Sequence, residues 1–457
     1  MTTLIILTAL GLTCLFSEIF GFKKLLHGIV LTGLLLALGA TIMDWNKDLV
    51  QFNDMIHLDN SSLAFMALLI VLTALWLIMS PTFFEEASSK TDHYALIIFS
   101  LVGAQLMACF SNMLILFLGI EILSICMYVL AGSRKSDLNS NEAALKYFLL
   151  GAFATGFLLL GITFIYGETG SFHIQKISSY FIENAGAPST LAVAGALLMF
   201  TAMAFKVSAV PFHFWAPDVY QGSPTYVTAF MSTVVKTAAF AALFRLFQDA
   251  FQSISNVWET TIWIISASTI LIGNIIAVYQ TNFKRMLAYS SISHAGYMLM
   301  TVLAITPSAS SSLFFYATAY SVSSIAAFAV LILISRSSGD ESIAAFRGMA
   351  KSNPLLASVV VVVVLSLAGI PPLAGFFAKY YIFSSTMQAG FTGLVLIAIT
   401  GSLIGVFYYF RVIIALFDTD TNAAKIKPEL SFTIVLLITT LAALVLGLAP
   451  GLLAGII

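Results

Sequence analysis

Ionisable side chains lie deep inside apolar stretches at four places in this chain, where proton exchange is the chemistry they can perform. Lys236 has no other charged residue within eight positions on either side. A lysine in the hydrocarbon core of a membrane costs about 3 kcal/mol or more, and such residues are usually functional. Glu121, Lys206 and Lys379 lie in similar surroundings. Burial disfavours the charged form of such groups, so the four residues predict a path for a small cation, most simply a proton.

Each of these residues also has a structural interpretation. Glu121 can form a salt bridge between helices, for which Lys206 is the predicted partner. Lys236 can be purely structural. Lys379 can extend toward a membrane surface, because three aromatic residues follow it within four positions. A mobile proton distinguishes the functional interpretation from these alternatives.

Three further residues are weaker candidates for the same relay. His294 follows a serine-rich segment in an apolar run, and His213 lies beside a cluster of prolines. Either histidine can instead be a hydrogen-bonded core residue. Lys146 lies four residues after Glu142, so a helix-end salt bridge is an alternative to a place on the path.

The elements that must position these residues are predicted to be membrane-spanning helices. The chain has 457 residues, of which 60% are hydrophobic and 9% charged, whereas soluble domains have about a quarter charged residues. The composition predicts an all-α polytopic membrane protein. Its predicted spans lie near 2–21, 25–43, 60–80, 93–110, 112–131, 142–166, 189–222, 225–248, 257–279, 284–304, 310–335, 353–388, 391–417 and 430–455.

Other classes of function lack support in the composition. The net charge of −1 gives no reason to expect a nucleic-acid partner. The three cysteines have no metal-ligand spacing, and no glycine-rich phosphate loop is present. The sequence therefore predicts neither a metal nor a cofactor in this chain.

Prolines interrupt two of the predicted spans. The seventh span contains Pro211, Pro217 and Pro224, and the twelfth contains Pro371 and Pro372. Proline removes a backbone donor from a helix, and non-helical backbone in a membrane occurs only inside protein or beside a water-filled cavity. The break near Pro211 and the lysine before it therefore predict one polar pocket.

An internal repeat is weakly visible. Spans four to eight overlay on spans nine to thirteen with a shift of about 160 to 170 residues. Five spans is an odd number, so the second copy is predicted to be inverted, as in many transporters. Chance similarity between apolar helices is the alternative. The predicted domains are N-terminal helices 1–3 at 1–91, a first repeat at 92–250, a second repeat at 251–417 and a C-terminal helix at 418–457.

The distribution of lysine and arginine predicts the orientation. With the N-terminus outside, the inner loops hold thirteen of these residues and the outer loops hold three. Positive residues concentrate on the cytoplasmic side, so both termini are predicted on the outer side.

The stretch from Ala204 to Pro224 resembles the signature of the antiporter-like membrane subunits of respiratory complex I. Leu118–Glu121, Leu287–His294 and Ser366–Pro372 extend the resemblance over about 300 residues. It implies fourteen helices, of which ten form two inverted five-helix repeats, with helices 7 and 12 discontinuous and a Glu–Lys pair at the centre. It also implies one proton channel per subunit, driven by quinone reduction elsewhere in the complex.

The resemblance further implies partners and location. NADH, FMN, iron–sulfur clusters and quinone belong to other subunits of such a complex, and neighbouring antiporter-like subunits, lipid and protons are the expected partners. A bacterial cell membrane is the expected location. A Mrp-type cation/proton antiporter and an inert scaffold are the alternative functions.

Overall fold

The computed structural model of the chain describes residues 1–83, 90–184, 188–418 and 425–456. Residues 84–89 and 419–424, which the predicted domains 1–91 and 418–457 include, lie outside the described residues. The described chain is mostly helical and divides into two compact units. Unit 1 comprises Met1–Val207 and Val234–Ile262, and unit 2 comprises Ser208–Thr233 and Trp263–Ile456.

Among its described residues, unit 1 contains the nine helices α1–α9, a two-stranded antiparallel hairpin, and helix α12 with the irregular turns that follow it. The elements are α1 Thr2–Phe16, α2 Leu26–Met43, β1 Leu49–Gln51, β2 Ile56–Leu58, α3 Asn60–Ile78, α4 Ser80–Phe83, α5 Lys90–Cys109, α6 Met113–Ala131, α7 Leu138–Thr169, α8 Ile174–Glu183, α9 Thr190–Lys206, α12 Lys236–Arg245, the π-helical turn η2 Leu246–Ala250 and the 3-10 helix η3 Gln252–Ile254.

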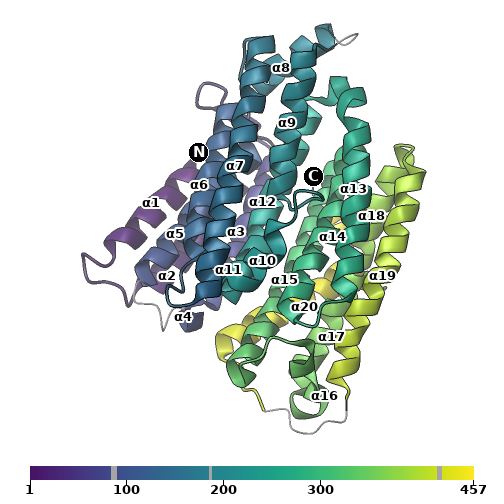
Figure 1. Cartoon of the computed structure of the whole chain (residues 1–457). Coiled ribbons are helices and arrows are strands. Elements are labelled where there is room, and N and C mark those ends of the chain that lie inside the picture. The colour runs from purple at the N-terminus through teal and green to yellow at the C-terminus, as the bar shows by residue number, and fades with distance from the viewer. Residues whose placement is uncertain (84–89, 185–187, 419–424, 457) are drawn as a thin grey trace. The chain divides into compact units, whose positions relative to one another are not determined.

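Unit 2 holds the remaining helices. They are α10 Trp215–Gly222, α11 Thr225–Phe230, α14 Phe283–Leu303, α15 Ala309–Ser338, η4 Ile343–Phe346, α16 Met349–Ser352, α17 Pro354–Ala368, α18 Ala374–Gln388, α19 Thr392–Leu416, α20 Leu430–Leu448 and α21 Gly451–Ala454. The π-helical turn η1 Met231–Val235 and helix α13 Ser255–Val278 each cross from one unit to the other along the chain. Figure 1 labels most of these elements.

Local side chains fix where many of these helices begin. Asn112 accepts a hydrogen bond from Leu114 N at the start of α6, and Asn282 accepts one from Arg285 N at the start of α14. Ser189 accepts one from Ala192 N at the start of α9. These side chains satisfy backbone N–H groups that a helix start leaves free.

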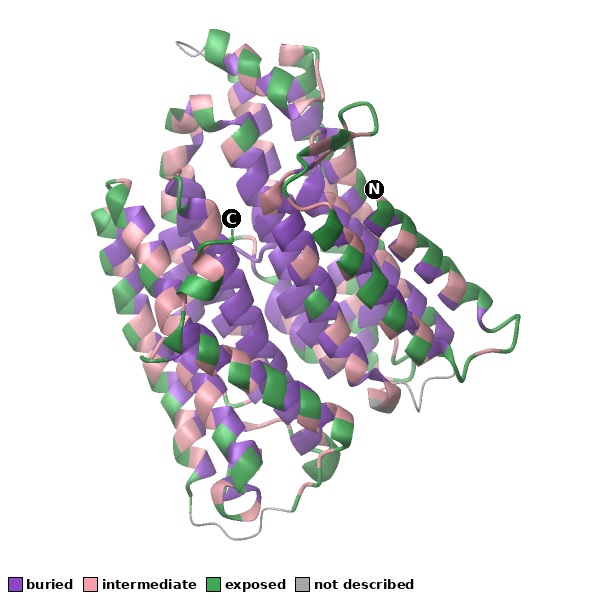
Figure 2. Ribbon diagram, turned by 180° about the vertical axis from the view of Figure 1, so that it is seen from behind, coloured by how far each residue is buried: buried purple, intermediate pink, exposed green. Residues whose placement is uncertain are grey.

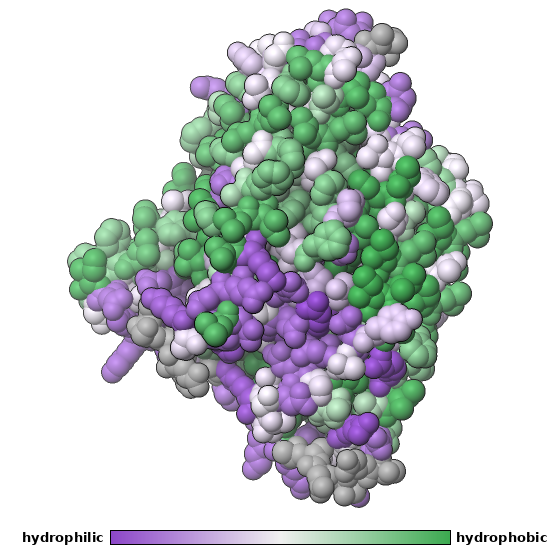
Figure 3. Space-filling view, in the orientation of Figure 1, coloured by the Kyte–Doolittle hydropathy of each residue, from purple (hydrophilic) through white to green (hydrophobic). Residues whose placement is uncertain are grey.

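Within each unit, the degree of burial separates core helices from peripheral ones. Helix α15 is buried along its apolar length, and the segment from α11 through α12 is equally buried, whereas α2 and α19 are exposed on much of their surface (Figure 2). The outward face of α7 is apolar, with Leu145, Phe148 and Phe153 exposed (Figure 3). Exposed apolar faces of this extent suit lipid rather than water.

Ten helices among the described residues are long and apolar enough to cross a membrane. Three shorter apolar helices are α1, α9 and α17. Helix α9 ends at Lys206 before α10 begins at Trp215, and α17 ends at Ala368 before α18 begins at Ala374. The first interruption contains Pro211, and the second contains Pro371 and Pro372. Pro217 lies within α10, and Pro224 directly precedes α11.

Candidate functional site

Lys206 is the last residue of α9, and its side chain is buried in unit 1. The ammonium group donates a hydrogen bond of 2.6 Å to Ser124 Oγ on α6 and lies 5.7 Å from the centre of the Tyr147 ring. The Ser124 hydroxyl group and the Tyr147 ring therefore surround the ammonium group inside an apolar unit.

Glu121 lies half-buried on the same face of α6, three residues before Ser124. Its Oε1 accepts a hydrogen bond of 2.8 Å from Thr155 Oγ1 on α7. The structure thus brings Glu121 and Lys206 into one neighbourhood, but the hydrogen bonds of the two charged groups go to separate hydroxyl groups. The direct ion pair that the sequence predicts is absent among the described residues.

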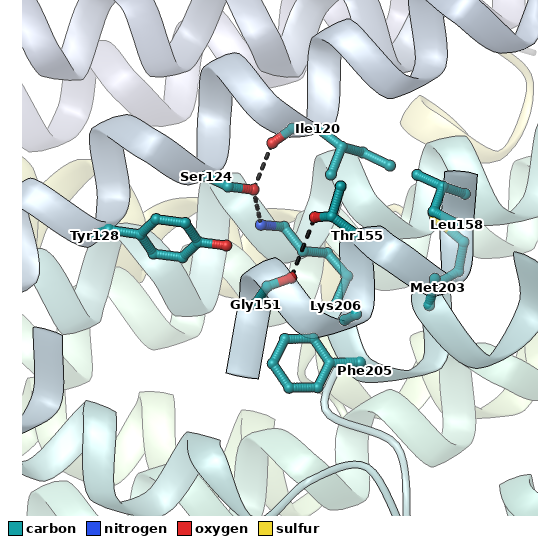
Figure 4. Close-up of a pocket in the computed structure, with 11 residues that line it drawn as sticks. Ile120, Ser124, Tyr128, Gly151, Thr155, Leu158, Met203, Phe205 and Lys206 are labelled. Carbon is teal, nitrogen blue, oxygen red and sulfur yellow. Dashed lines mark hydrogen bonds between the residues drawn. The ribbon is translucent and has the colours of Figure 1, made fainter. Parts of the chain in front are cut away.

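A cavity of about 20 Å³ lies beside the Lys206 side chain, lined by residues of α6, α7 and α9 (Figure 4). That volume holds about one water molecule. Gly151 leaves room for the Tyr128 side chain at the cavity wall, because a Cβ atom there would lie 2.0 Å from the Tyr128 hydroxyl oxygen. The Ser124 and Thr155 hydroxyl groups provide polar contacts for a water molecule at this position.

Lys236 is the first residue of α12 and directly follows the π-helical turn η1. Its exposed fraction is 3%, and α12 packs against α3, α5 and α9 within unit 1. Single π-helical turns within helices are frequent at functional sites. The structure therefore places the predicted central lysine inside protein, beside a local irregularity of its helix.

Lys379 lies in unit 2 and binds the carbonyl end of the other interrupted helix. Its ammonium group donates hydrogen bonds of 2.8 Å to Ala368 O, at the end of α17, and of 2.7 Å to Ser402 Oγ on α19. It also lies 5.2 Å from the centre of the Tyr297 ring. This buried arrangement differs from the alternative in which Lys379 extends to a membrane surface.

His294 is buried in unit 2, and both of its ring nitrogens contact tyrosine hydroxyl groups. Nδ1 lies 2.7 Å from the Tyr316 hydroxyl oxygen, and Nε2 lies 3.2 Å from that of Tyr409. The Tyr409 hydroxyl group also forms a hydrogen bond with Ser290 Oγ. An imidazole between two hydroxyl groups can accept a proton on one nitrogen and release one from the other.

A second chain of buried polar groups lies near Lys379. The Tyr408 hydroxyl donates to Asn274 Oδ1 at 3.1 Å, and Asn274 Nδ2 donates to the Tyr297 hydroxyl oxygen at 3.2 Å. Sequence reasoning did not identify these residues or Ser402. A signal was available, since tyrosine usually lies at the ends of membrane spans and these tyrosines lie well inside long apolar helices.

His213 lies in the non-helical segment between α9 and α10. Its Nδ1 and the Ser208 Oγ are buried without a hydrogen-bond partner among the described residues. Ser208 has a φ of 62°, which is uncommon for a residue other than glycine. Buried polar atoms are normally hydrogen-bonded to protein or water, so this segment suits a hydrated position.

Lys146 has surroundings unlike those of the other candidates. It pairs with Glu142 at 2.7 Å, and the side chains are 39% and 61% exposed, respectively. The observed pair agrees with the helix-end alternative. Lys146 is therefore not buried on a proton path in the structure.

Lys284, counted above among the inner-loop charges, is buried instead within the first turn of α14. Its ammonium group donates to Ser223 O at 2.7 Å and Gln221 O at 3.2 Å, and lies 3.7 Å from a Glu341 carboxylate oxygen. The carbonyl end of α10 thus binds a lysine as well. The loop assignment was wrong because a count of charges along the chain does not show which ones fold inward.

Arg245, counted above among the outer-loop charges, is also buried, at the end of α12. Its guanidinium group donates to Phe110 O at 2.8 Å and pairs with Asp59 at 3.1 Å. This residue joins α12 to the start of α3. The loop assignment failed here for the same reason.

Comparison with known proteins supports a single family. The sequence model described as "NADH:quinone oxidoreductase/Mrp antiporter, TM" matches residues 111–405. The chain is 46% identical to NADH-quinone oxidoreductase subunit N of Cytophaga hutchinsonii over 99% of its own length and 98% of the relative's. It is 42% identical to the subunit N of Flavobacterium johnsoniae, with 99% of each chain covered.

Solved structures share the fold. A chain of respiratory complex I from Thermus thermophilus matches with a TM-score of 0.84 and 32% identity, covering 99% of this chain and 98% of that one. A chain of the Mrp complex from Dietzia matches with a TM-score of 0.89 and 20% identity, covering 99% and 95%, which shows the fold alone. The lysine at position 379 and the segment from Asp218 to Pro224 also resemble subunit N. The chain belongs to the NADH:quinone oxidoreductase/Mrp antiporter family, and within it to the subunit N group.

Proposed function

We propose that this chain is a proton-translocating membrane subunit of NADH:quinone oxidoreductase and that quinone reduction in other subunits drives it. The main supporting observation is that two buried lysines, Lys206 and Lys379, lie beside the interruptions of two helices, each with a serine hydroxyl partner. A scaffold has no need for such costly buried charges. Their surroundings suit groups that gain and lose protons.

The proposed relay uses the predicted residues in distinct roles. Glu121 and Lys206 form a coupled pair in unit 1, with Ser124 and Thr155 as hydroxyl partners. Lys236 holds and passes the proton. His294 and Lys379 carry it in unit 2, where Lys379 delivers it toward the outer face.

Two of the predicted residues have lesser roles in this proposal. His213 and Ser208, in the interrupted segment, hold water beside the path. Lys146 lies off the path and stabilises α7 through its pair with Glu142.

Movement of one charge relative to the other in the Glu121–Lys206 pair supplies enough energy to change the protonation of the amine. At an effective dielectric constant of about 20, a unit charge 4 Å away is worth about 4 kcal/mol. A shift of the Glu121 carboxylate relative to Lys206 therefore changes how strongly the amine retains its proton. The separate hydroxyl partners of the two groups allow such a shift without leaving either group unpaired.

The proposed topology has fourteen crossings, of which ten form two inverted repeats, 92–250 and 251–417, and it has both termini outside. Two matching local features support the repeat. Helices α7 and α15 both end at a left-handed glycine, Gly170 and Gly339. An isolated antiparallel bridge joins Asn112 to His173 in the first half, and another joins Asn282 to Ser342 in the second.

The expected surroundings follow from the same proposal. The chain lies in a bacterial cell membrane beside other membrane subunits, and neighbouring antiporter-like subunits are its closest partners. NADH, FMN, iron–sulfur clusters and quinone bind elsewhere in the complex. This chain contributes proton movement and no redox step.

A Mrp-type cation/proton antiporter is the second candidate, because the Dietzia Mrp chain shares the fold. The two functions differ in their driving force. Vesicles that contain the chain in its native complex should acidify on one side when NADH and quinone are added, and hydrophilic iron–sulfur subunits should co-purify with it. Proton movement that requires a sodium gradient and ignores NADH would identify the antiporter instead.

A further inference from the structure

A second cavity lies in unit 2, at the end where α13 and α19 stop. Its volume is about 360 Å³, within the range of pockets that bind small molecules. Thr281 and Ser342 line it on the side of α13, and Ile414 and Ala415 of α19 line it on the other. None of the proposed relay residues lines this cavity.

Two arginines give the cavity its charge. Arg347 and Arg411 both line it, together with Asp418, so the three ionised side chains sum to one net positive charge. Arg347 Nε lies 3.5 Å from Asp418 Oδ2, and Arg411 Nη1 donates to Val278 O at the end of α13. A guanidinium group has five N–H donors in a planar fork that suits phosphate oxygens. These contacts therefore leave donors on both side chains for an anion.

An exposed apolar strip on α19 leads to the cavity. Leu403, Phe407, Phe410, Ile414 and Phe417 are all exposed, by 39% to 69%. They are spaced by three or four residues and therefore share one face of the helix. Tyr279, at the end of α13, is 78% exposed. The strip has the apolar character that acyl chains require, and it ends beside the two arginines.

We infer that this cavity binds the phosphate group of an anionic phospholipid, whose acyl chains lie along the exposed face of α19. Basic pockets between membrane helices bind such headgroups. A phosphate ion alone would gain nothing from the apolar strip. A carboxylate on a soluble partner protein would match the arginines but would leave the apolar strip unexplained. Asp418 competes with the phosphate for Arg347, so it limits the affinity.

The test measures lipid binding to the purified full-length chain by native mass spectrometry. Delipidated protein is titrated with phosphatidylglycerol, with phosphatidylethanolamine of the same acyl chains, or with inorganic phosphate. Phosphatidylglycerol should bind most tightly. Each of Arg347→Gln and Arg411→Gln should weaken it about fivefold, since a basic residue near anionic lipid contributes about 1 kcal/mol. Arg336→Gln removes an arginine outside the cavity and should change little.

Asp418→Asn provides a test that loss of folding cannot imitate. Removal of the competing carboxylate should tighten phosphatidylglycerol binding, and a misfolded protein would not gain affinity. Equal binding of phosphatidylglycerol by the wild type and the double arginine variant would overturn the inference. Displacement of the lipid by inorganic phosphate at equal concentration would also overturn it, and would assign the arginines to a free anion.

Discussion

At the scale of single residues, the recurring feature is a buried lysine beside the end of a helix. Lys379 binds Ala368 O at the end of α17, and Lys284 binds Ser223 O just after α10, where carbonyl groups supply partial negative charge. Lys206 ends α9 and binds Ser124 Oγ. Lys284 also lies 3.7 Å from the Glu341 carboxylate, whereas Lys379 is held by a carbonyl group and a hydroxyl group. A lysine held by neutral groups stays buried and can still release its proton, because no carboxylate stabilises its ammonium form.

Ser402→Ala tests the hydroxyl partner of Lys379. The variant removes a hydrogen bond to a charged group, worth about 1.5 to 3 kcal/mol, so proton pumping by the reconstituted complex should slow by about tenfold to a hundredfold. Thr400→Ala is the matched control, because Thr400 is exposed on the same helix and its hydroxyl group bonds only Leu396 O. Equal pumping by the two variants would exclude Ser402 from the relay.

Tyr409→Phe tests the hydroxyl partner of His294. The ring remains for packing, but Nε2 and Ser290 Oγ both lose their contact with the Tyr409 hydroxyl group. Pumping driven by NADH should fall several-fold while the complex assembles normally. Tyr279→Phe, at a tyrosine that is 78% exposed, should pump like the wild type. A Tyr409 variant with full pumping would contradict the proposed role of the tyrosine cluster.

At the scale of elements, the break between α17 and α18 depends on a glycine. Gly369 has a φ of +87°, and a Cβ atom there would lie 2.9 Å from Lys379 Cδ. Gly369→Ala should therefore cost about 1 to 3 kcal/mol through backbone strain and also displace the lysine. Gly390→Ala is the matched control, with a φ of +91° and no atom within 4 Å of its Cβ position.

The two glycine variants separate strain from function. Both should lower the unfolding temperature by a similar amount, and Gly369→Ala alone should lose proton pumping. If Gly390→Ala loses pumping equally, strain rather than the position of Lys379 explains the defect.

The junction between α3 and α12 predicts a pH dependence. Burial alone would raise the pKa of Asp59, but the Arg245 charge and two hydrogen bonds from Ser62 outweigh it and hold that pKa below its usual value. The ionised form therefore stabilises the fold above a pH of about 4, the unfolded pKa of aspartate. This contribution is lost as the pH falls through the lower folded value.

Asp59→Asn should lower the free energy of unfolding by about 2 kcal/mol at pH 7, a value typical of a hydrogen bond to a charged group. The difference from the wild type should shrink at acidic pH. Thermal unfolding at a series of pH values measures both effects. Asp54→Asn, in the exposed turn before β2, is the control and should unfold like the wild type throughout. A stability difference that is constant with pH would refute the electrostatic explanation.

The sequence predicted those elements whose signal is local. Apolar runs located the helices, and prolines located the interruptions around Pro211 and Pro371. The separate hydroxyl partners of Glu121 and Lys206, in place of the predicted ion pair, were not predictable, because the position of a hydroxyl group such as that of Ser124 depends on how the helices are rotated. The Asn274, Tyr297 and Tyr408 chain joins the consecutive helices α13 and α14 to α19, much later in the sequence, and spacing within one helix gives no information on such contacts.

At the scale of the whole molecule, individual charges lie where their position in the sequence did not predict. Lys284 and Arg245 were predicted in loops, yet both are buried. Without these two residues, the predicted inner loops still hold a large excess of positive residues over the outer ones, which is the basis of the proposed orientation. Protease or thiol-labelling access to each loop in sealed vesicles would test it.

Proton translocation by Lys236 variants tests the central claim most directly. The measurement is NADH-driven acidification by the complex reconstituted in liposomes, with exposed Lys176→Ala on α8 as the control. Lys236→Ala removes the titratable group, and Lys236→Arg keeps a positive charge that does not release its proton. Both variants should assemble, and both should lose most of their pumping while the control retains it. Full pumping by an assembled Lys236→Ala complex would show that protons do not pass through this residue.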